Sequence, residues 1–444
     1  MKNSQIMAVL ALLISLIFSP GLALGQQDST LTLDEAVETA LMENHSIIIN
    51  RNLAEIDENS ATIGNAGYLP NLSLNSSYSE TVEDTRLEFP NQTGQDVSGN
   101  RSSSLNASVD LQWVLFDGLG NRYRLQSLKT GAELSDVQTR REIELTLLEV
   151  YDRYLTVVTQ AQLLEVTREA VDISNQRYQR ARQDFEAGGG SRVDLLNAEV
   201  SLNQDSIRVV ETEVSLNRAK RNLRVLLGSE PSVDIVVEKE IPINEELSLD
   251  TLLPAALSQN ARLSASDIEE EQARLQLRQS RAARYPQIST NASYRYNRFE
   301  SDAGQFLFQE TDGFTAGLSF SFTLFDGFRR NIDVQNNQIR LRNSREQQEL
   351  LEKQVRRNVL NAYETYNSNL YLLEKQQLNV ETAELNFERT EIAFRQGQVT
   401  NTDFREAQLN LLQTRQDLIS LRAQVKLSEI DLLQLSGQLI GSDD

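Results

Sequence analysis

The sequence predicts a mixed fold in which a unit of two transmembrane β-strands and one long coiled-coil helical hairpin occurs twice. First, apolar and polar residues alternate in LNASVDLQWVLFDG (105–118), broken only at Val114, which is typical of a strand with one apolar face. Second, a helical pattern follows this segment for roughly seventy residues. Third, the same succession starts again at FTAGLSFSFTLFDG (314–327), so the chain is internally duplicated.

Residues 1–25 have the pattern of a secretory signal peptide. Lys2 supplies a positive charge, Ile6–Phe18 is apolar, and Ala23-Leu24-Gly25 fits a cleavage site with small residues. The apolar run is about a dozen residues long, whereas a transmembrane helix needs about 20. We therefore expect an exported mature chain that starts at Gln26, with a retained N-terminal anchor as the alternative.

The composition excludes several classes of function. The chain has no Cys, which excludes disulfides, thiol chemistry and a Cys-based metal site, and its single His, His45, lacks partners for a metal or catalytic site. A net charge of −21 disfavours binding to nucleic acid or to anionic lipid headgroups. Gly188-Gly189-Gly190 does not form a P-loop, because no strand precedes it and no Lys follows in place. We expect no enzyme, no cofactor and no nucleic-acid partner.

The first repeat is expected to span residues 26–246. A helix is predicted from Thr32 to about Gly67, since Tyr68-Leu69-Pro70 cannot continue it. Strands follow at about 69–80 and 104–117, joined by a polar loop from Glu80 to Arg101. A helical hairpin at 119–227 completes the repeat and turns at Gly188.

The second repeat is expected at residues 247–444 in the same order. After its first helix, strands are predicted at about 286–299 and 313–326, followed by a helical hairpin at 328–436. The helices carry heptad seams, whose positions in the first hairpin are Val150, Tyr154, Val157, Ala161, Leu164, Val171, Tyr178 and Phe185, then Leu195, Ala198, Leu202, Val209, Thr212, Leu216, Ala219, Leu223 and Leu226. At 1.5 Å per residue the first arm spans on the order of 100 Å, so the helices are expected to pack lengthwise.

The four predicted strands have the length and alternation of outer-membrane barrel strands. Trp113, Phe116, Phe322 and Phe325 lie where the apolar band should end, as interfacial aromatic residues would. A sheet in lipid must close and four strands are too few, so several chains would have to contribute. The alternative is a water-exposed antiparallel sheet that covers an apolar core.

Several motifs in duplicated order carry a resemblance to a known family. They are Leu33-Asp34-Glu35-Ala36 at a helix start, Tyr68-Leu69-Pro70, the two FDG turns, and the helix-turn motifs FEAGGGSRVDLLNAE (185–199) and FRQGQVTNTDFREAQ (394–408). In these motifs, and over nearly all of the mature chain, the sequence resembles the TolC family of outer-membrane efflux and secretion channels.

The resemblance implies a homotrimer in which a 12-stranded β-barrel in outer-membrane lipid continues into a periplasmic α-helical barrel. The expected function is that of a passive exit duct in a tripartite efflux or type I secretion system. Its partners would be a periplasmic adapter (membrane fusion) protein and an inner-membrane pump, in the outer membrane of a Gram-negative cell. Drugs, metal ions, polypeptides and glycans all remain compatible as cargo.

The resemblance also implies roles for residues in the two helix-turn motifs. The adapter-contact positions are Gly188, Gly189, Gly190 and Arg192 in the first turn and Gly397, Gln398 and Val399 in the second. Asp403 and Glu406 match acidic residues that face the pore entrance, and their first-repeat counterparts are Asp194 and Asn197. Val399 occupies the position of a usual arginine, so a gate held shut by that arginine is not implied.

Two alternatives remain open from the residues themselves. Symmetry would gather the carboxylates of Asp403 and Glu406 into a ring that selects cations, but Asp403 could equally serve only as an acid in the first turn of a helix. For the whole chain, the alternative function is that of an exported coiled-coil scaffold protein without a pore, which the heptads alone would allow.

Overall fold

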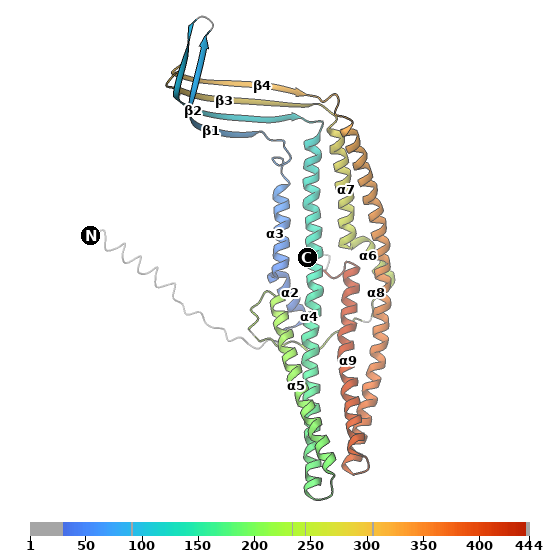
Figure 1. The fold of residues 1–444 in the computed structure, drawn as a ribbon. Helices are drawn as coiled ribbons and strands as arrows, with labels where there is room; N and C mark the ends of the chain where they lie inside the picture. The colour runs from blue at the N-terminus through green and yellow to red at the C-terminus, as the bar shows by residue number, and fades with distance from the viewer. Residues whose placement is uncertain (1–29, 90–91, 233, 245, 304–305, 441–444) are drawn as a thin grey trace, which may run out of the picture. The chain divides into compact units, whose positions relative to one another are not determined.

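The computed structural model describes residues 30–89, 92–232, 234–244, 246–303 and 306–440 (Figure 1), so the predicted signal peptide lies outside the described residues. The chain divides into two compact units, which are described separately. Unit 1 contains the residues up to Glu43, Glu149–Pro242 and Leu373–Gln424; unit 2 contains Asn44–Leu148, Ile243–Leu372 and the residues from Val425. None of the helices within the described ranges is both long and apolar enough to cross a membrane.

The elements follow one another in two similar series. The first series is α2 (Leu33–Glu43), α3 (His45–Ser60), β1 (Asn71–Phe89), β2 (Gln92–Phe116), α4 (Gly120–Glu186) and α5 (Arg192–Leu226). The second is α6 (Leu249–Gln259), α7 (Ala261–Ala282), β3 (Gln287–Ser301), β4 (Phe308–Ser321), α8 (Arg329–Arg395) and α9 (Asn401–Leu435). The helical arms begin and end within one or two residues of the predicted hairpin limits.

The core of unit 1 contains many of the predicted heptad positions, but the predicted seam is wrong toward the end of α4, where Phe185 is exposed and Ser174 and Arg177 are buried instead. Its buried members include Val150, Tyr154, Val157 and Leu164 on α4, Leu216, Ala219 and Leu223 on α5, and Ala36 and Ala40 on α2. Tyr154 also fixes the chain beside α2, because its hydroxyl donates to the carbonyl oxygen of Leu31 at 2.9 Å. Burial, together with the charge of Glu238, raises the pKa of Tyr154 to about 12, so it stays a neutral donor.

The single helix predicted from Thr32 to Gly67 is wrong, since α2 ends at Glu43 and α3 starts at His45. Asn44 separates them, and its side-chain oxygen accepts hydrogen bonds from the backbone N–H groups of Ser46 and Ile47 at 2.8 and 3.1 Å. Asn260 separates α6 from α7 in the same way. Asn is a preferred N-cap residue because it can satisfy these otherwise unpaired donors, and apolar periodicity alone does not reveal such a cap.

Unit 2 contains a four-stranded antiparallel sheet in the order β1-β2-β3-β4, whose strands lie side by side in Figure 1. Leu74 pairs with Val109, Val109 with Tyr294, and Tyr294 with Phe314, which gives a continuous apolar row across all four strands. Cross-strand partners share one face of a sheet. The predicted apolar face is therefore confirmed.

The opposite face of the sheet is polar and internally hydrogen-bonded. Asp110 on β2 accepts from Asn75 on β1 at 3.0 Å, from Ser108 at 2.6 Å and from Ser293 on β3 at 2.6 Å. These contacts tie three strands together through one carboxylate. A face of this kind suits water, whereas the apolar face does not.

The polar loop predicted from Glu80 to Arg101 is wrong, because β1 and β2 continue through most of it. Glu80 pairs with Ser103, Val82 with Arg101 and Leu87 with Gln95. The ladder hydrogen bonds of a hairpin use only the backbone, so a polar sequence can extend it without an apolar face. β4 likewise begins earlier than predicted, at Phe308, and ends at Ser321 rather than continuing to 326.

Gly228, at the end of α5, has a left-handed backbone and lies very close to the backbone of Glu43. Its φ is +74°, and a Cβ atom there would lie 2.3 Å from the carbonyl oxygen of Glu43. Gly188 has a φ of +80° but has nothing within 4 Å of the same position. The two glycines therefore share the left-handed backbone and differ in the space around them.

We expect Gly228→Ala to destabilise the protein more than Gly188→Ala. The left-handed conformation costs about 1–2 kcal/mol in either variant, and overpacking against Glu43 adds about 1–3 kcal/mol for Gly228→Ala alone. Thermal unfolding followed by helical circular dichroism measures the difference. Equal losses in the two variants would contradict the close approach of Gly228 and Glu43.

Candidate functional site

The two helix-turn motifs end their helices in the same way. After α4, the N–H groups of Gly189 and Gly190 both donate to the carbonyl oxygen of Asp184, at 3.0 and 2.9 Å. After α8, Gly397 N–H donates to Phe394 at 3.0 Å and Gln398 N–H donates to Ala393 at 2.9 Å. A glycine with positive φ and backbone bonds of this type form a regular helix C-cap. The predicted adapter-contact residues all lie in or directly beside these turns, and most of them are exposed.

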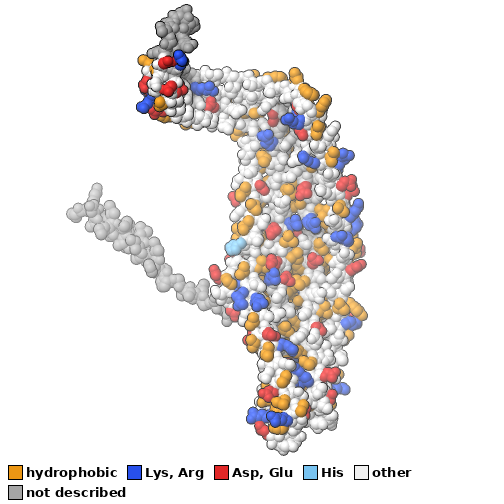
Figure 2. Space-filling view, viewed as in Figure 1, with side chains coloured by type: hydrophobic (Ala, Val, Ile, Leu, Met, Phe, Trp, Pro, Cys, Tyr) orange, Lys and Arg blue, Asp and Glu red, His pale blue; other side chains and the backbone are white. Residues whose placement is uncertain are grey.

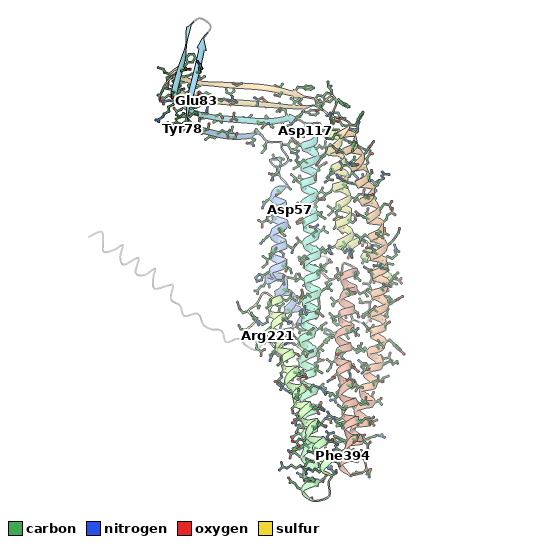
Figure 3. The ribbon with its side chains drawn as sticks, in the orientation of Figure 1. Asp57, Tyr78, Glu83, Asp117, Arg221 and Phe394 are labelled. Atoms are coloured by element: carbon green, nitrogen blue, oxygen red, sulfur yellow. The ribbon has the colours of Figure 1, made fainter. Side chains whose placement is uncertain are left out.

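The two turns also contact each other within unit 1. The side-chain amide of Asn401 donates to the carbonyl oxygen of Asp194 at 3.3 Å. Arg180 on α4 lies 5.3 Å from the ring centroid of Phe394 and donates to the carbonyl oxygen of Arg395 at 2.8 Å. Phe394 lies at the end of α8 in Figure 3 and stacks on Phe404 of α9 at 4.7 Å. These contacts hold the ends of both helical hairpins as one structure.

Asp403 takes part in a local cap at the start of α9. Its carboxylate accepts hydrogen bonds from the backbone N–H and the hydroxyl of Thr400, at 2.9 and 2.7 Å, and its own N–H donates back to the Thr400 hydroxyl at 3.2 Å. This is a reciprocal capping box. The hydrogen bonds from Thr400 lower the pKa of Asp403, so its carboxylate stays charged at neutral pH. The capping role that the sequence left open is therefore present in addition to any role in a pore.

A cavity of about 1020 Å³ brings together several of the predicted site residues from both repeats. Its lining includes Asp194 and Asn197 on α5 and Asn401 and Glu406 on α9, whereas Asp403 lies outside it. Arginines also line it, namely Arg177, Arg208 and Arg405. Asp194 and Glu406, predicted for an entrance, thus lie beside positive charge that the sequence pattern does not predict.

The least anticipated feature is a buried ion pair beside this cavity. Asp205, with a side chain only 1% exposed, receives two hydrogen bonds from the guanidinium of Arg405 at 2.6 and 2.9 Å. Ser174 also donates to Asp205, and Gln408 donates to Ser174 at 3.1 Å. Asp205 occupies the heptad position between Leu202 and Val209, so an acid within an apolar seam was the signal that could have revealed it.

The four predicted interfacial aromatics lie near the junctions between strands and helices. Trp113 and Phe116 are in β2, and the Trp113 indole N–H donates to the carbonyl oxygen of Tyr68 at 2.8 Å. Phe322 and Phe325 lie beyond the end of β4 rather than within a strand. Hydrophobic side chains gather at these junctions in Figure 2, and Phe325 meets Phe328 edge to face at 5.5 Å. Their membrane contact remains a prediction.

Two long helical hairpins, each connected to a pair of strands in one antiparallel sheet by an FDG turn, define an outer-membrane channel fold. The family model for the outer membrane efflux protein matches residues 37–229 and 252–438, so the chain belongs to this family and the predicted resemblance is confirmed. Membership places it in the outer membrane of a Gram-negative cell, extending into the periplasm.

Individual relatives agree with this assignment. The chain is 21% identical to outer membrane protein TolC of Escherichia coli (strain K12) over 359 residues, which cover 79% of this chain and 72% of that protein. It is 26% identical to the alkaline protease secretion protein AprF of Pseudomonas aeruginosa over 279 residues, or 60% and 55% of the two chains. In fold it is similar to the CmeC outer membrane channel of Campylobacter jejuni, with a TM-score of 0.74, 15% identity and coverage of 95% and 92%.

We expect Asp205→Ala to destabilise the protein by about 3–5 kcal/mol, because it leaves the largely buried Arg405 without its carboxylate. Glu186→Ala is the matched control, since it breaks the exposed ion pair with Arg182 and should cost about 0–1 kcal/mol. Chemical denaturation followed by circular dichroism measures both. If both variants lost a similar amount of unfolding free energy, the buried pair would have no special structural role.

Proposed function

We propose that three copies of this chain form a passive outer-membrane exit duct. The duct receives substrates from a periplasmic adapter protein and an inner-membrane pump, as in a tripartite efflux or type I secretion system. In this assembly the sheets form a 12-stranded barrel and the helical hairpins form a periplasmic tunnel. The proposal involves no catalytic step.

The carrying observation is the open sheet with one apolar face. β1 and β4 are its outermost strands, and each has one edge without a neighbour among the described strands. In hydrocarbon an unpaired backbone group costs several kcal/mol, so a lipid-facing sheet must close on itself. Pairing β4 of one copy with β1 of the next satisfies both edges, and a barrel of this kind needs at least about eight strands.

The relatives support both kinds of transport. The family description names efflux, whereas AprF is named for the secretion of alkaline protease. The exposed turn residues Gly188, Gly189, Arg192, Gly397 and Gln398, with Gly190 and Val399 beside them, form the surface proposed to meet the adapter.

The proposed entrance uses Asp403, Glu406 and Asp194, which are all exposed. Three copies would arrange these carboxylates around one mouth, and a ring of like charges selects cations. Val399 contributes no charge there, so the entrance depends on contacts other than an arginine at that position.

The competing function is that of an exported coiled-coil scaffold without a pore. Extraction from membranes, gel migration with and without heating, and conductance in planar bilayers separate the two. The duct requires a heat-labile oligomer that conducts ions. A chain that purifies as a soluble monomer without detergent would overturn the proposal.

We expect Asp403→Ala combined with Glu406→Ala to weaken block of the conductance by multivalent cations, with a half-blocking concentration at least about tenfold higher. Glu406→Ala alone should give part of this effect while it leaves the Thr400–Asp403 cap intact. Glu388→Ala on α8, an exposed carboxylate outside the cavity lining, is the control and should block like the parent. Unchanged block in the double variant would exclude these carboxylates from the pore.

A further inference from the structure

Arg177 on α4 is a buried cation with an unused hydrogen-bond donor. The residue is 4% exposed, and its Nε–H has no hydrogen-bond partner among the described residues. Burial, reinforced by the nearby positive charge of Arg405, lowers the pKa of Arg177 to about 10, so the guanidinium is still protonated at neutral pH. A buried guanidinium with an unpaired donor is costly, which makes a further hydrogen-bond acceptor, and in particular an anionic one, favourable.

The carboxylate nearest to this cluster is already occupied. Asp205 holds Arg405 through two hydrogen bonds, accepts from Ser174, and lies 3.7 Å from the guanidinium of Arg208. Asp205 therefore lies among three guanidinium groups, those of Arg405, Arg208 and Arg177, and it does not accept from the Nε–H of Arg177. Asp194 and Glu406 also line the cavity, but both are exposed and form no ion pair within the described ranges.

The cavity offers more than charge. Its volume of about 1020 Å³ is of the size that accommodates a small organic molecule. Apolar side chains contribute to its walls, namely Leu163, Val200, Leu409 and Leu412. Asn401 also lines the cavity, and its amide oxygen is buried and has no donor among the residues described. A ligand with an anionic group for Arg177 and an apolar body for the leucine and valine side chains would match this lining.

We propose that this cavity binds small organic carboxylates, with the carboxylate on the guanidinium of Arg177 and the apolar part against the leucine and valine side chains. Arg presents a planar fork of donors that matches a carboxylate in two places. The apolar walls favour an organic anion over an inorganic one, which would leave them exposed to water. The site goes beyond the proposed duct and does not rest on it, because binding can be measured at equilibrium without transport.

Fluorine NMR of 4-fluorobenzoate mixed with the purified full mature chain in detergent tests the site. We expect the line of 4-fluorobenzoate to broaden, and unlabelled benzoate to reverse the broadening. The neutral analogue 4-fluorobenzamide and protein-free micelles should produce little of it. Equal broadening of the benzoate and benzamide lines by the parent protein would overturn the proposal without any variant.

Variants then assign the binding to Arg177. Arg177→Gln should weaken the affinity for 4-fluorobenzoate by about tenfold or more, the expected effect of losing a charge-assisted contact. Arg153→Gln, an exposed arginine of the same helix outside the cavity, should bind like the parent. Unchanged affinity for 4-fluorobenzoate in Arg177→Gln would overturn the proposal. It would also be overturned if inorganic phosphate reversed the line broadening at the same concentration as unlabelled benzoate does. Because the competition experiments use the parent chain, they decide the matter even if Arg177→Gln does not fold.

Discussion

The backbone groups along the outer edges of β1 and β4 impose the constraint on which the rest of the molecule depends. One chain supplies a four-stranded sheet whose apolar row runs from Leu74 to Phe314, and that row cannot face lipid while the edges are open. The helices show the same incompleteness. α5 exposes Val193, Ile207 and Val210, each by more than half. Apolar surface of this extent favours a covering partner, which supports the proposed assembly of several copies.

The buried ion pair between Asp205 and Arg405 has a different consequence from the apolar seams around it. Heptad packing alone permits neighbouring helices to slide by whole repeats, because each apolar layer resembles the next. Asp205 is satisfied only where Arg405 of α9 and Ser174 of α4 meet it together. A shifted register would leave a charge buried and unpaired, at a cost far larger than the net gain from the pair itself. The pair therefore specifies how α4, α5 and α9 align more than it adds to stability.

The features that sequence predicted well are those encoded in local periodicity. Alternation in 105–118 and 314–327 gave the apolar face of the sheet, and the three- and four-residue steps around Val150 and Leu216 gave the buried seam. The break at Asn44 was missed because a cap depends on one side chain, not on a period. The Thr400–Asp403 box could have been read from its spacing. By contrast, Arg405 and Asp205 are separated by 200 residues, so no local pattern pairs them.

The two repeats share the backbone of their helix turns but differ in the charges that they carry. Both turns use a left-handed glycine and equivalent caps, so the duplication reproduces the shape of the helical ends. Glu406 corresponds to Asn197 and Arg405 to Leu196. The second repeat therefore has a carboxylate and a guanidinium at positions where the first repeat has uncharged side chains. Arg177 and Asp205, in turn, belong only to the first repeat. The charged cluster therefore draws its residues from both repeats, so the pair of unequal hairpins, not a single hairpin, is the smallest unit able to hold it.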